Sequence, residues 1–270
     1  MKIPFAQIDA FADRPFTGNP AAVMPLAAWL DDATLQRIAE ENNLSETAFI
    51  VPIPGSQDDG GEGPDFELRW FTPALEVAMC GHATLASGHF VLSSDPSRDS
   101  VAFRTRQVGI LHVSRDGAGY RMALPAWPAE PRDLPAVLAG LGLDGAVETL
   151  WHKQRNALIV LETAEQVLAL TPDFRALAAD GDVLTIVTAP GTDTDVVSRV
   201  FAPGAGIDED PVTGSAHAVL APYWAGRLGR DRFTAYQASK RGGRLACTIE
   251  GDRVILGGRC VTVIEGSFTL

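Results

Sequence analysis

The sequence predicts an α+β protein with two pseudo-symmetric domains, each a curved or barrel-like sheet wrapped around a central buried helix. Three observations lead to this prediction. Runs of β-branched and alternating apolar residues recur along the chain, as strands require. Two helical segments, which begin at Gly81 and Gly214, have no polar face. Finally, the two halves of the chain repeat the same order of motifs.

The strand-like runs are separated by turn residues along the whole chain. These runs are IPFAQIDAF, AFIVPIP, FELRWFTP, VAFRTR, GILHVSRD, YRMALPA, NALIVLE, VLTIVTAP, GRLACTIE and DRVILGG. A helix is predicted in DDATLQRIAEENN (31–43), because Leu35 and Ile38 share one face behind an acidic first turn. The glycine-rich SQDDGGEGPD (56–65) predicts a turn, and the proline-rich LPAWPAEPRDLP (124–135) predicts a linker or domain edge.

The two glycine-led helical segments differ from ordinary surface helices. HATLASGHFVL follows Gly81 and SAHAVLAPYWAG follows Gly214, and both are apolar or small on every side. A helix without a polar face must be buried all round. In a chain this rich in strands, we expect a sheet to curve around each of the two helices.

The motif order within the two halves indicates an internal duplication. Asn19 precedes a strand and is followed 62 residues later by Gly81, whereas Asn156 precedes a strand and is followed 58 residues later by Gly214. In both halves the order is asparagine, strand, intervening helix, strand and buried helix. The alternative is a chance similarity between two strand-rich halves. The duplication predicts domains over residues 1–123 and 124–261.

Length, charge and cysteine content limit the classes of function. The chain has 270 residues, of which 46% are hydrophobic, and each domain can therefore bury a core. A net charge of −12 and a sequence pI near 4.8 disfavour nucleic acid as a partner. No apolar run is long enough to predict a membrane span or an export signal. Three cysteines without a CxxC motif predict neither disulfides nor a zinc knuckle, and they favour the cytoplasm.

The glycine-led helix starts suggest an anion site. The first turn of a helix has unpaired N–H groups and a partial positive charge, and a glycine lets a ligand approach the backbone closely. Helix starts at Gly81 and Gly214 that face each other would hold a carboxylate between the two halves without lysine or arginine. The alternative is that both helices are core supports whose N–H groups are capped internally.

Ionisable residues lie close to these helix starts. Asp210 and Ser215 flank a sharp Pro-Val-Thr-Gly corner, which lets both side chains point to one spot. Glu46 lies where the first helix gives way to a strand, and His82 directly follows a helix-starting glycine. Taken singly, each has an ordinary interpretation: a solvated loop carboxylate for Glu46, a capping or core histidine for His82, and a solvated acidic turn around Asp210.

Four motifs in order resemble the phenazine-biosynthesis PhzF-like family, which belongs to the proteins folded like diaminopimelate epimerase. They are QIDAFADRPFTGNPAAV, NLSETAF, LRWFTPALEVAMCGHATLASG and GIDEDPVTGSAH, and the resemblance extends from Gln7 to the final strand VTVIEGSF. It implies an active site in the cleft between two similar domains. It also implies that residues 262–270 return to the first domain and that the protein is a homodimer.

The resemblance assigns roles to individual residues. In the family a glutamate carries a proton, and its match here is Glu46. The resemblance implies an isomerase that moves a proton on a small carboxylate-bearing substrate without a metal or organic cofactor. The residues that it assigns are Glu46, His82 and Asp210 for catalysis, and Asn19, Gly81, Gly214 and Ser215 for substrate binding.

Three alternatives remain open at the level of sequence. The related epimerases use two cysteines, one at each helix start, but here only Cys80 is present, so we interpret it as a packing residue. A non-catalytic carboxylate-binding protein would keep the cleft without turnover. A metal enzyme would use Cys80, His82 and His89, although a seven-residue spacing places these histidines about 10.5 Å apart along a helix. The sequence does not name the substrate.

Overall fold

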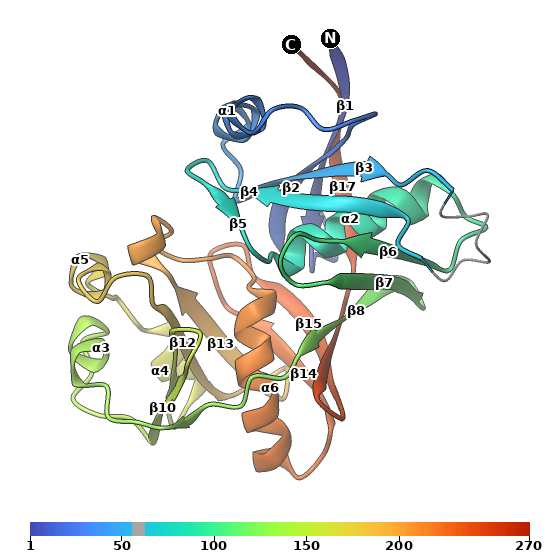
Figure 1. Cartoon of the computed structure of the whole chain (residues 1–270). Helices are drawn as coiled ribbons and strands as arrows, with labels where there is room; N and C mark the ends of the chain where they lie inside the picture. Colours follow the sequence, from blue (N-terminus) through green and yellow to red (C-terminus); the bar gives the residue numbers. More distant parts are fainter. Residues whose placement is uncertain (56–62) are drawn as a thin grey trace. The chain divides into compact units, whose positions relative to one another are not determined.

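The computed structural model describes residues 1–55 and 63–270. The chain forms two compact units, Met1–Ala123 with Gly257–Leu270 and Leu124–Leu256. Both units combine a mixed sheet with one long buried helix, which confirms the predicted α+β class (Figure 1). The turn expected in residues 56–65 falls mostly outside the described residues and stays a prediction.

The first unit contains a curved mixed sheet in the order β17, β1, β2, β3, β4, β6, β7 and β8. The pairs β2–β3 and β4–β6 are parallel and the other pairs are antiparallel. The two-residue strand β5 pairs with β4 beside β6. The bounds are β1 Lys2–Ala10, β2 Asn19–Pro25, β3 Glu46–Pro52, β4 Phe66–Phe71, β5 Glu76–Val77, β6 Ser100–Arg104, β7 Ile110–Asp116, β8 Gly119–Pro125 and β17 Cys260–Thr269.

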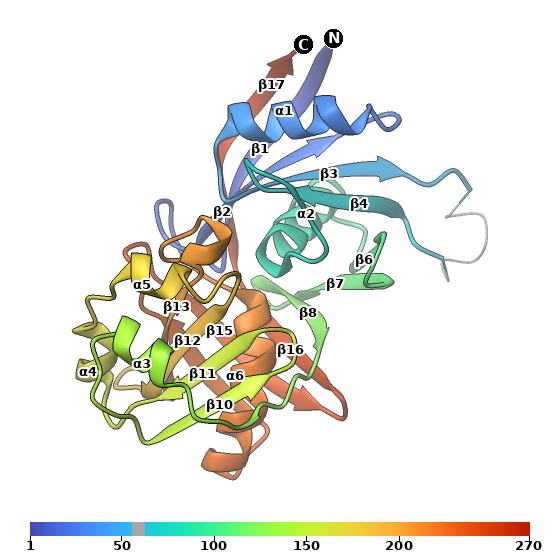
Figure 2. The ribbon, with the colours of Figure 1, turned by 60° about the vertical axis from the view of Figure 1, so that its left-hand side comes forward.

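Helix α2 (Gly81–Ser94) is enclosed by this sheet. It contacts β1, β2, β3, β6, β7 and β17, so strands cover it on several sides (Figures 1 and 2). Its residues from Gly81 to Gly88 are all buried, as the absence of a polar face predicts. The hydroxyl groups of Thr84 and Ser87 donate to the carbonyls of Cys80 and Ala83, at 2.6 and 2.8 Å. These polar groups are therefore satisfied within the helix itself.

Helix α1 (Asp32–Asn42) covers the opposite face of β3 and β4. Its N-cap Asp31 accepts a hydrogen bond from the Thr34 N–H at 2.9 Å, and its C-cap Asn43 is left-handed with φ 47°. Leu35 and Ile38 pack into a cluster with apolar residues of β1 to β4. The predicted helix is confirmed. Since α1 and α2 lie on opposite faces, β3 is buried on both sides, and successive residues alternate between the two helices.

The second unit has its own mixed sheet in the order β9, β10, β11, β12, β13, β14 and β15. The pairs β11–β12 and β13–β14 are parallel and the others are antiparallel. The bounds are β9 Glu130–Pro131, β10 Glu148–His152, β11 Asn156–Val160, β12 Leu184–Pro190, β13 Val196–Phe201, β14 Arg232–Gln237, β15 Gly243–Glu250 and β16 Arg253–Gly258.

Helix α6 (Gly214–Leu228) packs against β11, β12 and β15, and most of its residues are buried. The Trp224 indole N–H donates to Thr188 of β12 at 3.0 Å, which fixes the helix against the sheet. Three shorter helices join the strands of this unit, and α3 and α4 pack in the cluster on the other face. Their bounds are α3 Pro135–Gly140, α4 Ala164–Leu168 and α5 Phe174–Ala178, with a 3-10 turn at Pro203–Ala205.

The two units share one connection pattern. Pairs β1–β2, β2–β3, β3–β4, β4–β6 and β6–β7 are antiparallel, parallel, antiparallel, parallel and antiparallel. The series β10–β11, β11–β12, β12–β13, β13–β14 and β14–β15 repeats this pattern. Helix α2 crosses from β4 to β6, and α6 crosses from β13 to β14. The predicted pseudo-symmetry of the fold is therefore confirmed, with Asn19 and Asn156 at equivalent strand starts.

The end of the chain returns to the first unit. Strand β17 pairs antiparallel with β1 over its whole length, and the Leu270 N–H donates to the Met1 carbonyl at 2.8 Å. His89 of α2 bonds Thr262 of β17 at 2.9 Å and Tyr120 of β8 at 3.0 Å. The contact between His89 and Thr262 ties the returning strand β17 to the buried helix α2. No helix among the described residues is long and apolar enough to cross a membrane.

We predict opposite effects for two glycine-to-alanine changes in the two long helices. A Cβ at Gly88 of α2 would lie 2.4 Å from Val113 of β7, whereas a Cβ at the exposed Gly226 of α6 meets nothing within 4 Å. Gly88→Ala should lower the free energy of unfolding by about 1–3 kcal/mol through overpacking. Gly226→Ala should raise it by up to about 1 kcal/mol through helix propensity. Urea denaturation tests both, and equal effects would contradict the close packing of α2.

Candidate active site

The loop that enters β2 fixes the position of Asn19. The Phe16 N–H donates to the buried Asp9 carboxylate at 3.0 Å, which fastens the loop to β1. Gly18 has φ +67°, and a Cβ there would lie 2.2 Å from the Ala10 carbonyl oxygen. Only glycine fits this close approach. As a result Asn19 begins β2 as a fully buried residue.

Parallel pairing brings the starts of β2 and β3 to one edge of the sheet. Ala21 pairs with Glu46 in the register of these strands. Met24 and Phe49 face α1, so Asn19 and Glu46, which have the opposite parity, face α2. A carboxylate on this buried face is unusual, because the next residues along the same face are Ala48 and Ile50.

Asn19, Glu46 and His82 come together in the first unit. His82 Nε2 lies 3.0 Å from Glu46 Oε2, with exposed side-chain fractions of 4% and 12%. Asn19 Nδ2 lies 3.2 Å from His82 Nδ1 on the other edge of the ring. With a neutral ring, the Asn19 amide donates to Nδ1 and leaves an N–H on Nε2 that faces Glu46. The sequence predicted all three as site residues, although it did not predict these contacts.

Cys80 completes this group as the N-cap of α2. Its Sγ lies 3.5 Å from His82 Nδ1. Burial raises the pKa of the Cys80 thiol to about 11, and the nearby Glu46 carboxylate adds to the effect. Cys80 is therefore a neutral thiol near pH 7, which is the expected state of a packing residue and not of a reactive nucleophile.

The pKa of His82 is shifted in favour of the charged form of the side chain. Burial by itself lowers the pKa of His82, but the Cys80 sulfur and the Glu46 carboxylate together raise it well above 6.5. Because Cys80 holds its proton at neutral pH, Glu46 supplies the negative charge that acts there. The pair therefore favours an imidazolium next to a carboxylate, in a position that excludes most water.

Glu46, Cys80 and His82 also form the kind of cluster that can bind a metal, since their ligand atoms lie within 4.8 Å of one another. However, Cys80 approaches Nδ1 of the ring and Glu46 approaches Nε2. One ion takes one nitrogen of an imidazole, so one of the two side chains would have to move. His89 does not join the cluster, because its two nitrogens face Tyr120 and Thr262.

The loops that lead into the two long helices are held by equivalent ion pairs. Arg69 of β4 binds Glu76 in a bidentate manner, with both distances 2.7 Å. Arg199 of β13 binds Glu209 in the same way, at 2.7 and 3.0 Å. Both arginines also lie over the phenylalanine two residues further on, with ring distances of 4.9 and 5.0 Å. The glutamates each precede a helix-starting glycine by five residues.

The sequence contains a signal for these pairs that the motif analysis missed. Arg-x-Phe followed by Glu-x-x-x-x-Gly occurs once in each half, as RWF with EVAMCG and RVF with EDPVTG. The Arg-to-Glu separation is 7 residues in the first half and 10 in the second, but the shared motifs and contacts are independent support for the duplication. In the folded protein the two ion pairs set the backbone that ends at Gly81 and at Gly214.

The start of α6 is held by a buried network in the second unit. The side chains of Asp210 and Thr213 are hydrogen-bonded to each other. Gln237 of β14 accepts from the Thr213 N–H at 2.9 Å and donates to the Asp210 carbonyl at 2.8 Å. Asp210 is 9% exposed and Gln237 is fully buried. Gly214 and Ser215 follow as the first two residues of the helix.

His217 is a buried residue of α6 to which the sequence analysis gave no role. Its Nδ1–H donates to the Thr213 carbonyl at 2.8 Å, and within the described part of the chain its Nε2 has no hydrogen-bond partner. Burial lowers the pKa of His217 to about 4. His217 is therefore neutral at pH 7, in contrast to His82.

The predicted site residues thus fall into two groups. Asn19, Glu46, Gly81 and His82 belong to the first unit, whereas Asp210, Gly214 and Ser215 belong to the second. Side-chain contacts join the members of the first group, and the Asp210–Thr213–Gln237 network holds the start of the second. The convergence of both groups in one cleft stays a prediction.

Comparison with known proteins places this chain among the isomerases. An uncharacterized isomerase of Pseudomonas aeruginosa is 46% identical, with 100% of both chains covered. The crystal structure of a phenazine biosynthesis protein of the PhzF family from Enterococcus faecalis is 43% identical, covers 100% of both chains and has a TM-score of 0.89. A hydroxyproline epimerase from Agrobacterium vitis shares the fold, with a TM-score of 0.60, 11% identity, and 98% of this chain and 92% of its own covered.

The family model of the phenazine biosynthesis-like proteins (PhzC-PhzF) matches residues 8–266. The chain belongs to this family. The resemblance predicted from the four motifs is confirmed, and the protein is an isomerase. Its small-molecule substrate and the role of each side chain are not given by these comparisons.

We predict that Glu46→Gln lowers the pKa of His82. The neutral amide no longer favours an imidazolium 3.0 Å away, while burial still disfavours it. NMR titration of the imidazole resonances measures this directly. His89, whose pKa is lowered mainly by burial, is the internal control and should not move. An unchanged His82 titration would show that Glu46 is not its charge partner.

We predict that His217 makes the protein less stable in acid. Its pKa is about 4 in the folded state against an ordinary value of 6.5, so its contribution to stability is present above pH 6.5 and is lost as pH falls toward 4. Between pH 7.5 and pH 5 this amounts to about 2 kcal/mol. The raised pKa of His82 acts in the opposite direction over this range but is common to both proteins. In urea unfolding the wild type should therefore lose more stability than His217→Asn. An equal loss in both proteins would contradict the prediction.

Proposed function

We propose that the protein is a cofactor-independent isomerase in which Glu46 moves a proton between two carbons of a small carboxylate-bearing substrate. The observation that carries this proposal is the position of Glu46, a nearly buried carboxylate 3.0 Å from His82 beside the start of α2. A carboxylate in this place has no packing role, and its contact with His82 holds it beside the helix start, where it can act as a proton carrier.

The proposed step uses groups of this chain alone. The Glu46 carboxylate takes a proton from a carbon next to a double bond, and the electron pair of that C–H bond shifts into the π system. The protonated Glu46 then returns the proton to the carbon at the other end of the shifted double bond. Atoms and electrons balance, so the product is an isomer. A positioned general acid–base of this kind accelerates the reaction by about 10²–10⁴-fold.

The surrounding residues have supporting roles in the proposal. The His82 imidazolium stabilises negative charge on Glu46 and on the substrate as it develops. The free N–H groups at Gly81 and Gly214 bind the substrate carboxylate, because helix N-termini attract anions. Asn19 orients the His82 ring through the 3.2 Å contact, and when the ring is charged its amide turns so that the oxygen accepts from Nδ1–H. Asp210 stabilises the charges that develop during the proton transfer. Ser215 contributes a hydroxyl group to substrate binding.

The cysteine-type racemase receives less support. Such an enzyme needs one thiol at each helix start. Cys80 is the N-cap of α2, but Thr213 holds the equivalent N-cap position of α6. Its hydroxyl is hydrogen-bonded to Asp210, and the pKa of Cys80 is raised to about 11. The homodimer implied by the family resemblance stays a prediction.

The test replaces the proton carrier and keeps its shape. Glu46→Gln should lower the rate of deuterium exchange from D₂O into a bound ligand by about 10² or more, with binding retained. Cys80→Ala is the matched control and should exchange like the wild type. The ligands to screen are small unsaturated carboxylates, and NMR or mass spectrometry measures the exchange.

Three outcomes of this experiment separate the alternatives. Undiminished exchange in Glu46→Gln would remove Glu46 from the role of base. Loss of exchange in Cys80→Ala would favour thiol chemistry instead. A wild-type protein that binds a carboxylate without exchange, with affinity insensitive to Glu46→Gln, would be a binding protein.

A further inference from the structure

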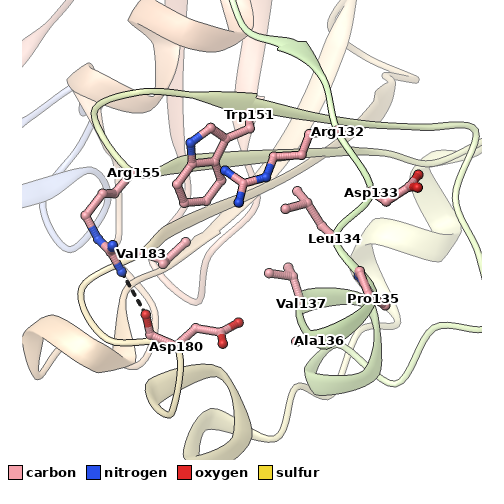
Figure 3. Close-up of a pocket in the computed structure, with 10 residues that line it drawn as sticks. All are labelled: Arg132, Asp133, Leu134, Pro135, Ala136, Val137, Trp151, Arg155, Asp180 and Val183. Carbon is pink, nitrogen blue, oxygen red and sulfur yellow. Dashed lines mark hydrogen bonds between the residues drawn. The ribbon is translucent and has the colours of Figure 1, made fainter.

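The second unit carries a pocket of about 310 Å³, and none of its lining residues belongs to the candidate active site (Figure 3). This volume is at the lower end of the range for small-molecule sites. Its lining includes Arg132, Leu134, Val137, Trp151, Arg155 and Val183.

Arg155 is held rigidly at the edge of the pocket. Its Nε donates to the Asp182 carbonyl at 2.8 Å and its Nη2 to the Asp180 carbonyl at 2.7 Å. The backbone of Arg155 has φ 59°, a left-handed conformation that residues with a side chain adopt rarely. Within the described chain no carboxylate forms an ion pair with this guanidinium. Its Nη1 is thus positioned in advance and remains available to a ligand.

Arg132 supplies a second cation to the same pocket. Its guanidinium lies 4.6 Å from the centre of the Trp151 ring, so the indole supports it from one side. Figure 3 shows the indole between Arg132 and Arg155. Among the described residues Arg132 also has no ion-pair partner, although the chain as a whole has a net charge of −12.

The two aspartates that line the pocket, Asp133 and Asp180, form no ion pair with these arginines in the described part of the chain. Asp180 contacts Arg155 through its backbone oxygen, and Figure 3 shows its carboxylate pointing away from that guanidinium. Apart from the two aspartates and the two arginines, the lining residues are apolar. Leu134, Val137 and Val183 belong to the core cluster of the second unit and are less than 9% exposed. Within the described residues, the pocket therefore combines two guanidinium groups without an ion-pair partner, two aspartates that do not contact them through their carboxylates, and an apolar floor.

We propose that this pocket is a second ligand site, which binds a small monocarboxylate with an apolar body. Guanidinium groups match a carboxylate in charge and in planar geometry. The carboxylate is held by Arg132 and Arg155, and the apolar body packs on the floor and on the edge of Trp151. The site does not depend on Glu46, so it is independent of the proposed isomerase chemistry.

The experiment uses benzoate as the probe and benzamide as its neutral isostere. NMR follows the Trp151 indole N–H and the methyl groups of Leu134, Val137 and Val183 during titration. Benzoate should shift these resonances in a saturable way, and benzamide should bind at least about tenfold more weakly. Arg132→Gln should lower the affinity for benzoate by about tenfold, because one charged hydrogen-bond donor is lost.

The controls keep the proposal falsifiable. Arg121→Gln removes an exposed arginine of β8 that does not line the pocket, and it should leave benzoate affinity unchanged. Glu46→Gln should also leave the Trp151 shifts unchanged. Arg132 is the residue to change, because it is exposed, whereas the two backbone contacts of Arg155 make that residue part of the local fold.

Equal shifts with benzoate and benzamide would overturn the proposal, since the pocket would then recognise apolar surface alone. Unchanged benzoate affinity in Arg132→Gln would also overturn it. Shifts at His82 that occur without any shift at Trp151 would place the carboxylate at the proposed active site only. That last result would support the proposed function while refuting the second site.

Discussion

The fold depends on the burial of two helices that have no polar face. Residues Gly81 to Gly88 of α2 are all buried, and a Cβ at Gly88 would overlap Val113 of the enclosing sheet. Such a helix is stable only where strands cover it on several sides. The sheet must then curve around it, and the helix start is left at the edge where the parallel strands begin. Every proposed catalytic contact in the first unit follows from this geometry.

The two units keep the same supports and differ in chemistry. Arg69–Glu76 and Arg199–Glu209 hold equivalent loops, and Asn19 and Asn156 begin equivalent strands. Yet the position of the second unit that is equivalent to Glu46 in strand register is occupied by the buried Ile186. This follows because Ala21 pairs with Glu46 and Leu158, two residues after Asn156, pairs with Ile186. The duplicated scaffold therefore carries one carboxylate on the helix-facing side instead of two.

The two buried histidines illustrate how environment decides function. His82 lies between Asn19 and Glu46, and the adjacent carboxylate favours its charged form against the effect of burial. His217 has a backbone carbonyl as its partner, and burial keeps it neutral. Both follow a glycine-led helix start within three residues. Their neighbours, which come from distant strands, produce the opposite pKa shifts.

The sequence by itself determined the fold class, the long helices, most strands and the family, because hydrophobic periodicity and motif order are local properties of the chain. It also pointed to Asn19, Glu46 and His82. It predicted one helix between the strands NALIVLE and VLTIVTAP, where the structure has the two short helices α4 and α5. It did not predict α3, whose few residues carry little periodicity, or strands β5, β9, β10, β13 and β14. Only the tertiary structure decided the Glu46–His82 contact and the Arg–Glu pairs, because each joins residues that are distant in sequence or set by strand register. The pocket beside Trp151 has the same origin, since Arg132 and Arg155 line one pocket only when β9 pairs with β10.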